Sequence, residues 1–134
     1  EPVNIGPAAP GIFTIAGTQR AVAVNQDFSL NTAENPEARG RVITVYLTGI
    51  GVLDGDLAAG QAAPSTRLYR AALDSSATIA GRDTPLLFLG LTPGFVGLAQ
   101  ANIQLPADLP VGGALELVIS VNRQRSNPAL VAVR

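Results

Sequence analysis

Ala114-Leu-Glu-Leu-Val-Ile-Ser-Val121 is the stretch that decides the fold class. Every second residue from Leu115 to Val121 is leucine, isoleucine or valine, whereas Glu116 and Ser120 stand between them. A period of two residues is typical of a β-strand that packs one face against a core. We therefore expect a strand whose aliphatic side chains are buried and whose Glu116 side chain faces solvent.

The same alternation recurs elsewhere in the chain. Residues 41–48 place three aliphatic side chains on one face, those of Ile43, Val45 and Leu47. Residues 98–105 combine an apolar face with a largely amide face. Many short strands separated by turn residues predict an antiparallel β-sandwich, with a partly closed barrel as the alternative. The shorter β-rich runs lie at residues 11–15, 20–24, 68–73, 77–80, 85–89 and 130–133.

Three segments are expected to be irregular. Asn35-Pro-Glu-Ala-Arg-Gly40 predicts one tight helical turn, because asparagine caps a helix, proline suits its first position and glycine ends it. Residues 49–66 are rich in glycine, alanine and proline and predict a long loop. The proline-rich residues 1–7 predict a lead-in, which leaves residues 8–134 as a single domain.

Composition excludes most catalytic chemistry. The chain has no cysteine, histidine, methionine or tryptophan, and its nine basic residues are all arginine. It therefore lacks the residues for a Ser-His-Asp or Cys-His triad, a Schiff base, or a metal site with nitrogen or sulfur ligands. Hydrolysis by paired carboxylates survives, but almost all carboxylates fall in turns or on exposed faces. We expect no enzyme and no cofactor, and a carboxylate-based hydrolase is the least favoured alternative.

Charge and hydropathy narrow the range of partners. The formal net charge is −1, and the nine arginines are scattered among ten acidic residues. This pattern argues against nucleic acid as a partner, because binding to it needs a clustered cationic face. No stretch approaches ~20 uninterrupted apolar residues, so no membrane span is expected.

Two motifs near residue 50 suggest ligands but lack the required spacing. Gly49-Ile-Gly-Val-Leu-Asp54 is similar to a dinucleotide-binding motif, but its last position is a carboxylate that repels phosphate, and no helix pattern follows. Asp54-Gly-Asp56 offers two carboxylates for Ca²⁺, but Leu57-Ala-Ala-Gly60 adds no side-chain oxygen. We expect a turn and a solvated loop tip, and Ca²⁺ binding at Asp54 and Asp56 stays open.

Six residues are candidates for contact with a ligand or partner: Tyr46, Arg67, Tyr69, Asn102, Arg123 and Arg125. A sugar ring stacks on an exposed aromatic face, and only the tyrosines are expected to be free for that role. The arginines have two possible roles: to bind an anion through paired N–H groups, or to keep the edge of a strand solvated. We favour the solvated edge. A buried asparagine in a strand holds a loop in place through backbone hydrogen bonds, whereas an exposed one is available to a ligand. We favour the structural role for Asn102. The aromatic residues assigned to the core are Phe13, Phe28, Phe88 and Phe95.

Several sequence blocks, taken in order, carry a resemblance to a known family. The order resembles that of the uncharacterised C-terminal domain family of acidobacterial (Solibacter-type) proteins. Two positions depart from the pattern: Ala99 stands where an aromatic residue is expected, and Val121-Asn-Arg123 stands where a glycine-rich hairpin is expected. The blocks are Pro7-Ala-Ala-Pro-Gly-Ile-Phe-Thr14, Ala23-Val-Asn-Gln-Asp-Phe-Ser-Leu-Asn31, Asn35-Pro-Glu-Ala-Arg-Gly40, Leu47-Thr-Gly-Ile-Gly51, Leu91-Thr-Pro-Gly-Phe-Val-Gly97, Gln100-Ala-Asn102 and Leu105-Pro-Ala-Asp-Leu-Pro110.

The resemblance implies a module at the C-terminal end of larger exported or cell-surface proteins, with an immunoglobulin-like fold and no assigned activity. We therefore expect an antiparallel, Greek-key, immunoglobulin-like β-sandwich that is secreted or at the cell surface and acts as a non-catalytic structural or interaction module. Its expected partners are the upstream domains of the same polypeptide, together with a protein or a glycan. A glycan- or polymer-binding module is the first alternative, and Tyr46 or Tyr69 exposed in a concave patch would favour it. Two carboxyls facing each other across a pocket would favour the hydrolase.

Overall fold

Ten β-strands and no helix occur in the residues that the computed structural model describes, which are 8–51, 53–54, 62, 69–96 and 98–134. The predicted lead-in at residues 1–7 and most of the predicted loop at residues 49–66 lie outside these residues. The strands are β1 (Gly11–Ile12), β2 (Ala23–Val24), β3 (Val42–Thr48), β4 (Ser75–Ile79), β5 (Arg82–Thr84), β6 (Leu86–Leu91), β7 (Ala99–Gln104), β8 (Gly112–Val121), β9 (Gln124–Arg125) and β10 (Ala129–Val133).

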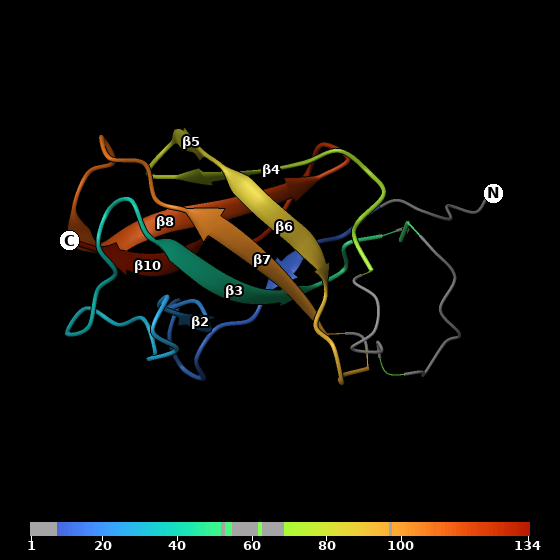
Figure 1. Cartoon of the computed structure of the whole chain (residues 1–134), viewed down its shortest axis with the longest axis horizontal. Helices are drawn as coiled ribbons and strands as arrows, with labels where there is room; N and C mark the ends of the chain where they lie inside the picture. The colour runs from blue at the N-terminus through green and yellow to red at the C-terminus, as the bar shows by residue number, and fades with distance from the viewer. Residues whose placement is uncertain (1–7, 52, 55–61, 63–68, 97) are drawn as a thin grey trace.

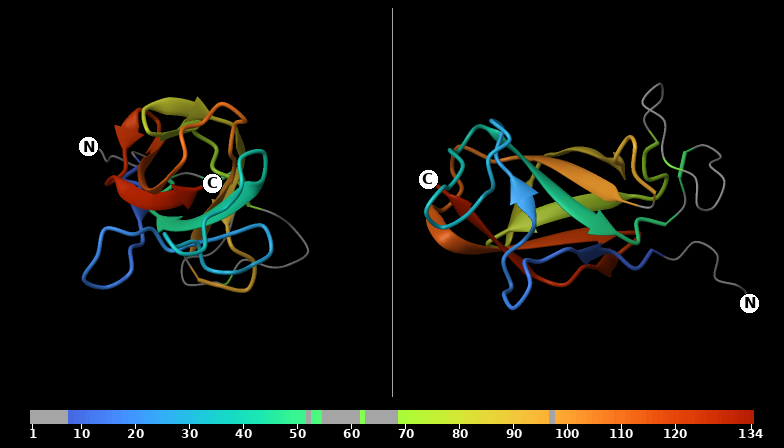
Figure 2. Two further views of the ribbon diagram at one scale, coloured as in Figure 1. Left: turned by 90° about the vertical axis from the view of Figure 1, so that its left-hand side faces the viewer. Right: turned by 90° about the horizontal axis from the view of Figure 1, so that it is seen from below.

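The strands form two antiparallel sheets, and the predicted β-sandwich is confirmed (Figure 1). The first sheet has the order β1-β3-β7-β6, with β2 also paired to β3, and the second has the order β10-β8-β4-β5, with β9 paired to β8. These orders match the A-B-E-D and G-F-C sheets of an immunoglobulin domain, with β5 added beside the C position. The end-on view in Figure 2 shows the two layers around a common interior. Because the described strands separate into two sheets, they make a sandwich rather than a closed barrel.

Side chains that alternate along the long strands fill the space between the sheets. In β3, Ile43, Val45 and Leu47 are buried, as the alternation predicts. Small residues of β7 face them across the ladder, with Ala101 opposite Val45 and Ala99 opposite Leu47. In β8 the predicted alternation holds for Glu116, which is exposed, and for Leu117, Ile119 and Val121, which are buried. Leu115 is only half-buried, and Val118 on the opposite face is also buried.

The segment between β1 and β2 joins the two sheets. Residues 13–22 form a hairpin, in which Ile15 N–H donates to Arg20 O (2.9 Å) and Val22 N–H donates to Phe13 O (2.8 Å). Arg20 then forms a parallel bridge with Leu130 of β10, in the other sheet. The right-hand view in Figure 2, seen from below, shows this N-terminal part of the chain in blue beside the C-terminal strand in red.

The helical turn predicted at Asn35–Gly40 is wrong. Glu37 forms a parallel bridge with Val133, so its N–H donates to Ala132 O (3.2 Å) and its carbonyl accepts from Arg134 N–H (2.8 Å). These bonds require extended backbone. Starting a helix fixes several residues for one hydrogen bond, so two bonds to a formed strand are favoured over a single turn.

The assignment of all four phenylalanines to the core is wrong for three of them. Phe13 is 43 % exposed, Phe95 is 55 % exposed and Phe28 is 87 % exposed. Only Phe88 is buried, beneath the guanidinium of Arg70, which lies 4.8 Å from the ring centre. Phe28 and Phe95 lie in turns, and Phe13 follows β1 at the base of the 13–22 hairpin. Aliphatic residues and alanines of the long strands make up most of the core cluster.

None of the described residues belongs to a helix long and apolar enough to cross a membrane.

Candidate functional site

An apolar groove lies on the outer side of the first sheet, and we name it the aromatic groove. Its volume is about 490 Å³. No charged side chain is found among the described residues that line it. The lining residues are Phe13, Thr14, Val22, Tyr46, Thr92, Phe95 and Leu98.

Two turns on either side of β3 position the aromatic rings. At the edge of β3, Phe13 N–H donates to Tyr46 O (3.1 Å) and Tyr46 N–H donates to Val22 O (3.1 Å), so the ends of the 13–22 hairpin flank Tyr46. Beyond β6, Thr92 N–H donates to Leu98 O (2.7 Å) and Phe95 N–H donates to Thr92 O (3.3 Å). The second turn places Phe95 at its tip. The groove therefore brings together segments that are far apart in sequence.

Thr92 contributes a buried polar atom to this apolar surface. The residue is 8 % exposed, and its hydroxyl oxygen has no hydrogen-bond partner in the described part of the chain. Leaving a buried polar group without a partner costs about 1–3 kcal/mol.

A row of polar side chains continues the groove along β3 and β7, and we name Thr44, Gln100 and Asn102 the amide row. Tyr46 lies opposite Gln100 in the ladder, and Thr44 lies opposite Asn102. The Thr44 hydroxyl (3.3 Å) and the Gln100 amide nitrogen (3.3 Å) both donate to Asn102 Oδ1. No partner among the described residues is found for Asn102 Nδ2 or Gln100 Oε1, and all three side chains are half-buried. The row keeps donors and acceptors available beside the aromatic rings.

The two predicted tyrosines are in different environments. Tyr46 is half-buried and lines the aromatic groove. Tyr69 is buried in the core cluster, and its carbonyl accepts from Leu91 N–H (2.8 Å). Tyr69 therefore offers no ring face to a ligand. Arg67 lies outside the described residues.

The structure does not bring Arg123 and Arg125 to one site. Asn122 (φ 51°) and Arg123 (φ 67°) form the two-residue turn of the β8–β9 hairpin, in which both central residues need positive φ. Arg123 lines a small pocket of about 180 Å³ together with Asp74 and three serines. Arg125 lines a separate pocket beside Glu116. Both arginines are exposed, and the geometry does not provide a shared anion site.

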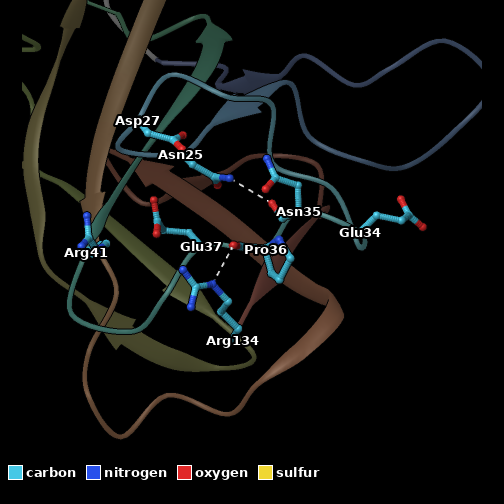
Figure 3. Close-up of a pocket in the computed structure, with 8 residues that line it drawn as sticks. All are labelled: Asn25, Asp27, Glu34, Asn35, Pro36, Glu37, Arg41 and Arg134. Carbon is cyan, nitrogen blue, oxygen red and sulfur yellow. Dashed lines mark hydrogen bonds between the residues drawn. The ribbon is translucent and has the colours of Figure 1, made fainter.

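A second cavity, also of about 490 Å³, is polar (Figure 3). Glu37 is buried there, and both of its carboxylate oxygens accept backbone N–H groups, from Gln26 (2.7 Å) and from Ala38 (2.7 Å). Figure 3 shows the Glu34 carboxylate pointing away from the other side chains. The lining residues are Asn25, Asp27, Glu34, Asn35, Pro36, Glu37, Arg41 and Arg134.

The carboxylates of Asp27 and Glu37 in this polar cavity accept hydrogen bonds from neighbouring groups. Asp27 Oδ1 accepts the hydroxyl (2.5 Å) and the N–H (3.0 Å) of Ser29, and these hydrogen bonds lower the pKa of Asp27 from 3.8. A general acid in a glycosidase needs the opposite shift, to a raised pKa. The oxygens of Glu37 are already occupied. No group of three or more acidic residues in the described part of the chain is placed to hold a metal ion.

Only one of the two carboxylates considered for Ca²⁺ lies in the described part of the chain. Asp54 Oδ1 accepts from Arg70 N–H (3.1 Å), which ties this carboxylate to the adjacent chain segment. Asp56 lies outside the described residues.

Sequence reasoning found Tyr46 but missed Phe13 and Phe95. The signal for Phe95 was present, because Thr92-Pro-Gly-Phe95 has the proline and glycine of a tight turn, and a residue at such a tip is exposed. Comparison with known proteins returns no match to a family model, a curated protein or a solved structure. The function is therefore argued from the geometry of the site.

Proposed function

We propose that this domain is a non-catalytic interaction module whose binding surface is the aromatic groove. The observation that carries the proposal is the gathering of Phe13, Tyr46 and Phe95 around one apolar hollow, although the core cluster is filled without them. Exposing apolar rings to water is unfavourable, and a contiguous apolar surface on a monomer marks a place where something binds.

The chemistry of the chain supports a role without catalysis. It has no histidine, cysteine or lysine to activate a hydroxyl nucleophile. In the polar cavity, the carboxylates of Asp27 and Glu37 are held by hydrogen bonds from neighbouring backbone N–H groups. The resemblance to the Solibacter-type C-terminal domains supports placing the module at the end of a larger exported or cell-surface protein, where it would hold its partner through the groove.

An apolar fluorescent probe tests whether the groove is an open binding surface. We expect the uncharged probe N-phenyl-1-naphthylamine to gain fluorescence with the folded chain, and the gain to fall at least fivefold in the double variant Phe13→Ala/Phe95→Ala. Phe28→Ala is the matched control, because Phe28 is more exposed than either ring but lies outside the groove. Equal fluorescence in the double variant and the wild type would overturn the groove as the binding surface.

An activity screen tests the second half of the proposal. The chain is expected to turn over no ester, glycoside, peptide or phosphoester. Turnover that disappears in Asp27→Asn or Glu37→Gln would overturn the non-catalytic role.

A further inference from the structure

The charge of the groove restricts its ligand. The described lining residues are uncharged, and so are the three residues of the amide row beside it. A charged ligand would lose its hydration there without gaining an opposite charge. The ligand is therefore neutral.

The polar atoms around the rings restrict it further. Asn102 Nδ2 and Gln100 Oε1 have no partner among the described residues, and both side chains are half-buried. A purely apolar ligand, such as an acyl chain, would cover these groups and leave them without hydrogen-bond partners, which is unfavourable. The ligand must supply both an apolar surface and several hydroxyl-type donors and acceptors.

The geometry of the sheet sets the length of the contact. Tyr46 with Gln100 and Thr44 with Asn102 are successive pairs on one face of the β3–β7 ladder. Residues two apart on a strand are separated by about 7 Å, so the rings and the amides form one continuous strip. A ligand that contacts both the rings and the amides therefore extends along this strip.

We infer that the aromatic groove and the amide row together bind a neutral oligosaccharide. The apolar face of a sugar ring stacks on Tyr46, Phe13 and Phe95, while its hydroxyl groups bond to the amides of Gln100 and Asn102. This inference rests on the proposed function and names its ligand class. It takes up the first alternative drawn from the sequence, because Tyr46 lies in a concave aromatic patch.

Affinity electrophoresis in gels that contain a polysaccharide tests the inference. We expect the chain to be retarded by at least one neutral polymer among hydroxyethylcellulose, xylan, mannan and β-1,3-glucan, and to run freely with the acidic polymers alginate and polygalacturonate. The apparent dissociation constant should rise at least tenfold in Phe95→Ala and in Asn102→Ala. Phe28→Ala should bind like the wild type.

The outcomes separate the two proposals. If no neutral polymer retards the chain while the apolar probe still reports the groove, the glycan inference is overturned and the interaction module stands. If the probe also fails to distinguish the Phe13→Ala/Phe95→Ala variant, both are overturned. Retardation that persists in Asn102→Ala would show that the amide row takes no part, and equal retardation by acidic polymers would overturn the neutrality of the ligand.

Discussion

The side chain of Asn31 pairs with the backbone of Ala132 as a neighbouring strand would. Asn31 Nδ2 donates to Ala132 O (2.9 Å), and Ala132 N–H donates to Asn31 Oδ1 (2.8 Å). Asn31 is 1 % exposed, and a further bond joins its amide to Asn25 Oδ1 (2.8 Å). Asn127 does the same for Ile12, accepting from its N–H (2.8 Å) and donating to its carbonyl (3.1 Å). Asparagine side chains thus complete the backbone hydrogen bonding where the strands end.

Removing the Asn31 amide is expected to destabilise the domain strongly. Asn31→Ala leaves the N–H of Ala132 buried without a partner, at about 1–3 kcal/mol, whereas the Ala132 carbonyl still accepts from Glu37 N–H. Asn102→Ala is the control, because the partners of Asn102 are half-exposed side chains that water can reach, and its cost should stay within about 0.5 kcal/mol. Urea denaturation followed by circular dichroism gives both values. Similar losses for the two variants would contradict this account.

The register of β8 predicts a second contrast. Leu117 is fully buried, and cutting it to alanine should cost about 2–5 kcal/mol through lost contacts and the cavity left behind. The neighbouring Glu116 is exposed, so Glu116→Ala should change the free energy of unfolding by no more than about 0.5 kcal/mol. Thermal and urea unfolding of the two variants test the register. Equal costs would mean that the alternation does not govern burial in this strand.

Acid stability should depend on Ser29. The Ser29 hydroxyl is the main cause that lowers the pKa of Asp27 below 3.8, followed by the Ser29 backbone N–H. A carboxyl whose pKa is lower in the folded protein adds stability above its unfolded pKa and loses it as pH falls through the folded pKa. Ser29→Ala should therefore raise the Asp27 pKa and flatten the fall in stability below about pH 4. An NMR titration of the Asp27 carboxyl measures the pKa directly, and an unchanged midpoint in Ser29→Ala would refute the assignment.

Substitutions of Phe28 should change the free energy of unfolding through the backbone conformation at this position rather than through lost packing of the ring. Its φ is 70°, in the left-handed region that glycine adopts without strain, and its side chain is 87 % exposed. We expect Phe28→Gly to be neutral or to stabilise by up to about 1 kcal/mol, and the β-branched Phe28→Val to cost about 1 kcal/mol. The midpoints of urea unfolding of Phe28→Gly and Phe28→Val, compared with the wild type, test these expected changes in stability. A large loss in Phe28→Gly would mean that the ring is packed in solution.

The long strands were predictable because their signal is local. In β3, β7 and β8 every second side chain must enter the core, so the period of two residues identifies both the strand and its buried face. Asn35–Gly40 was mispredicted because its partner, β10, is remote in sequence, and the local capping signals favoured a turn that this pairing replaces. Asn31 was missed for the same reason, since nothing near it in the sequence reveals the bond to Ala132.

The candidate site was predictable only in part. Tyr46 was found because its strand alternates, which places it on the outer face. Phe13 and Phe95 were assigned to the core by hydrophobicity, but hydrophobicity does not tell a buried ring from one that is exposed at a turn. Their gathering around Tyr46 depends on the sheet order, which joins segments that the sequence keeps apart.

The parallel bridges to β10 also set the timing of folding during synthesis. Arg20 pairs with Leu130 and Glu37 pairs with Val133. Asn31 bonds to Ala132, which is synthesised 101 residues later. Ribosomes add about 5–20 residues per second, so this part of the nascent chain spends roughly 5–20 s without the strand that completes it. The backbone N–H and C=O groups that later pair with β10 are accessible to other nascent chains throughout that interval. Slower translation between residues 37 and 129 lengthens this interval in proportion.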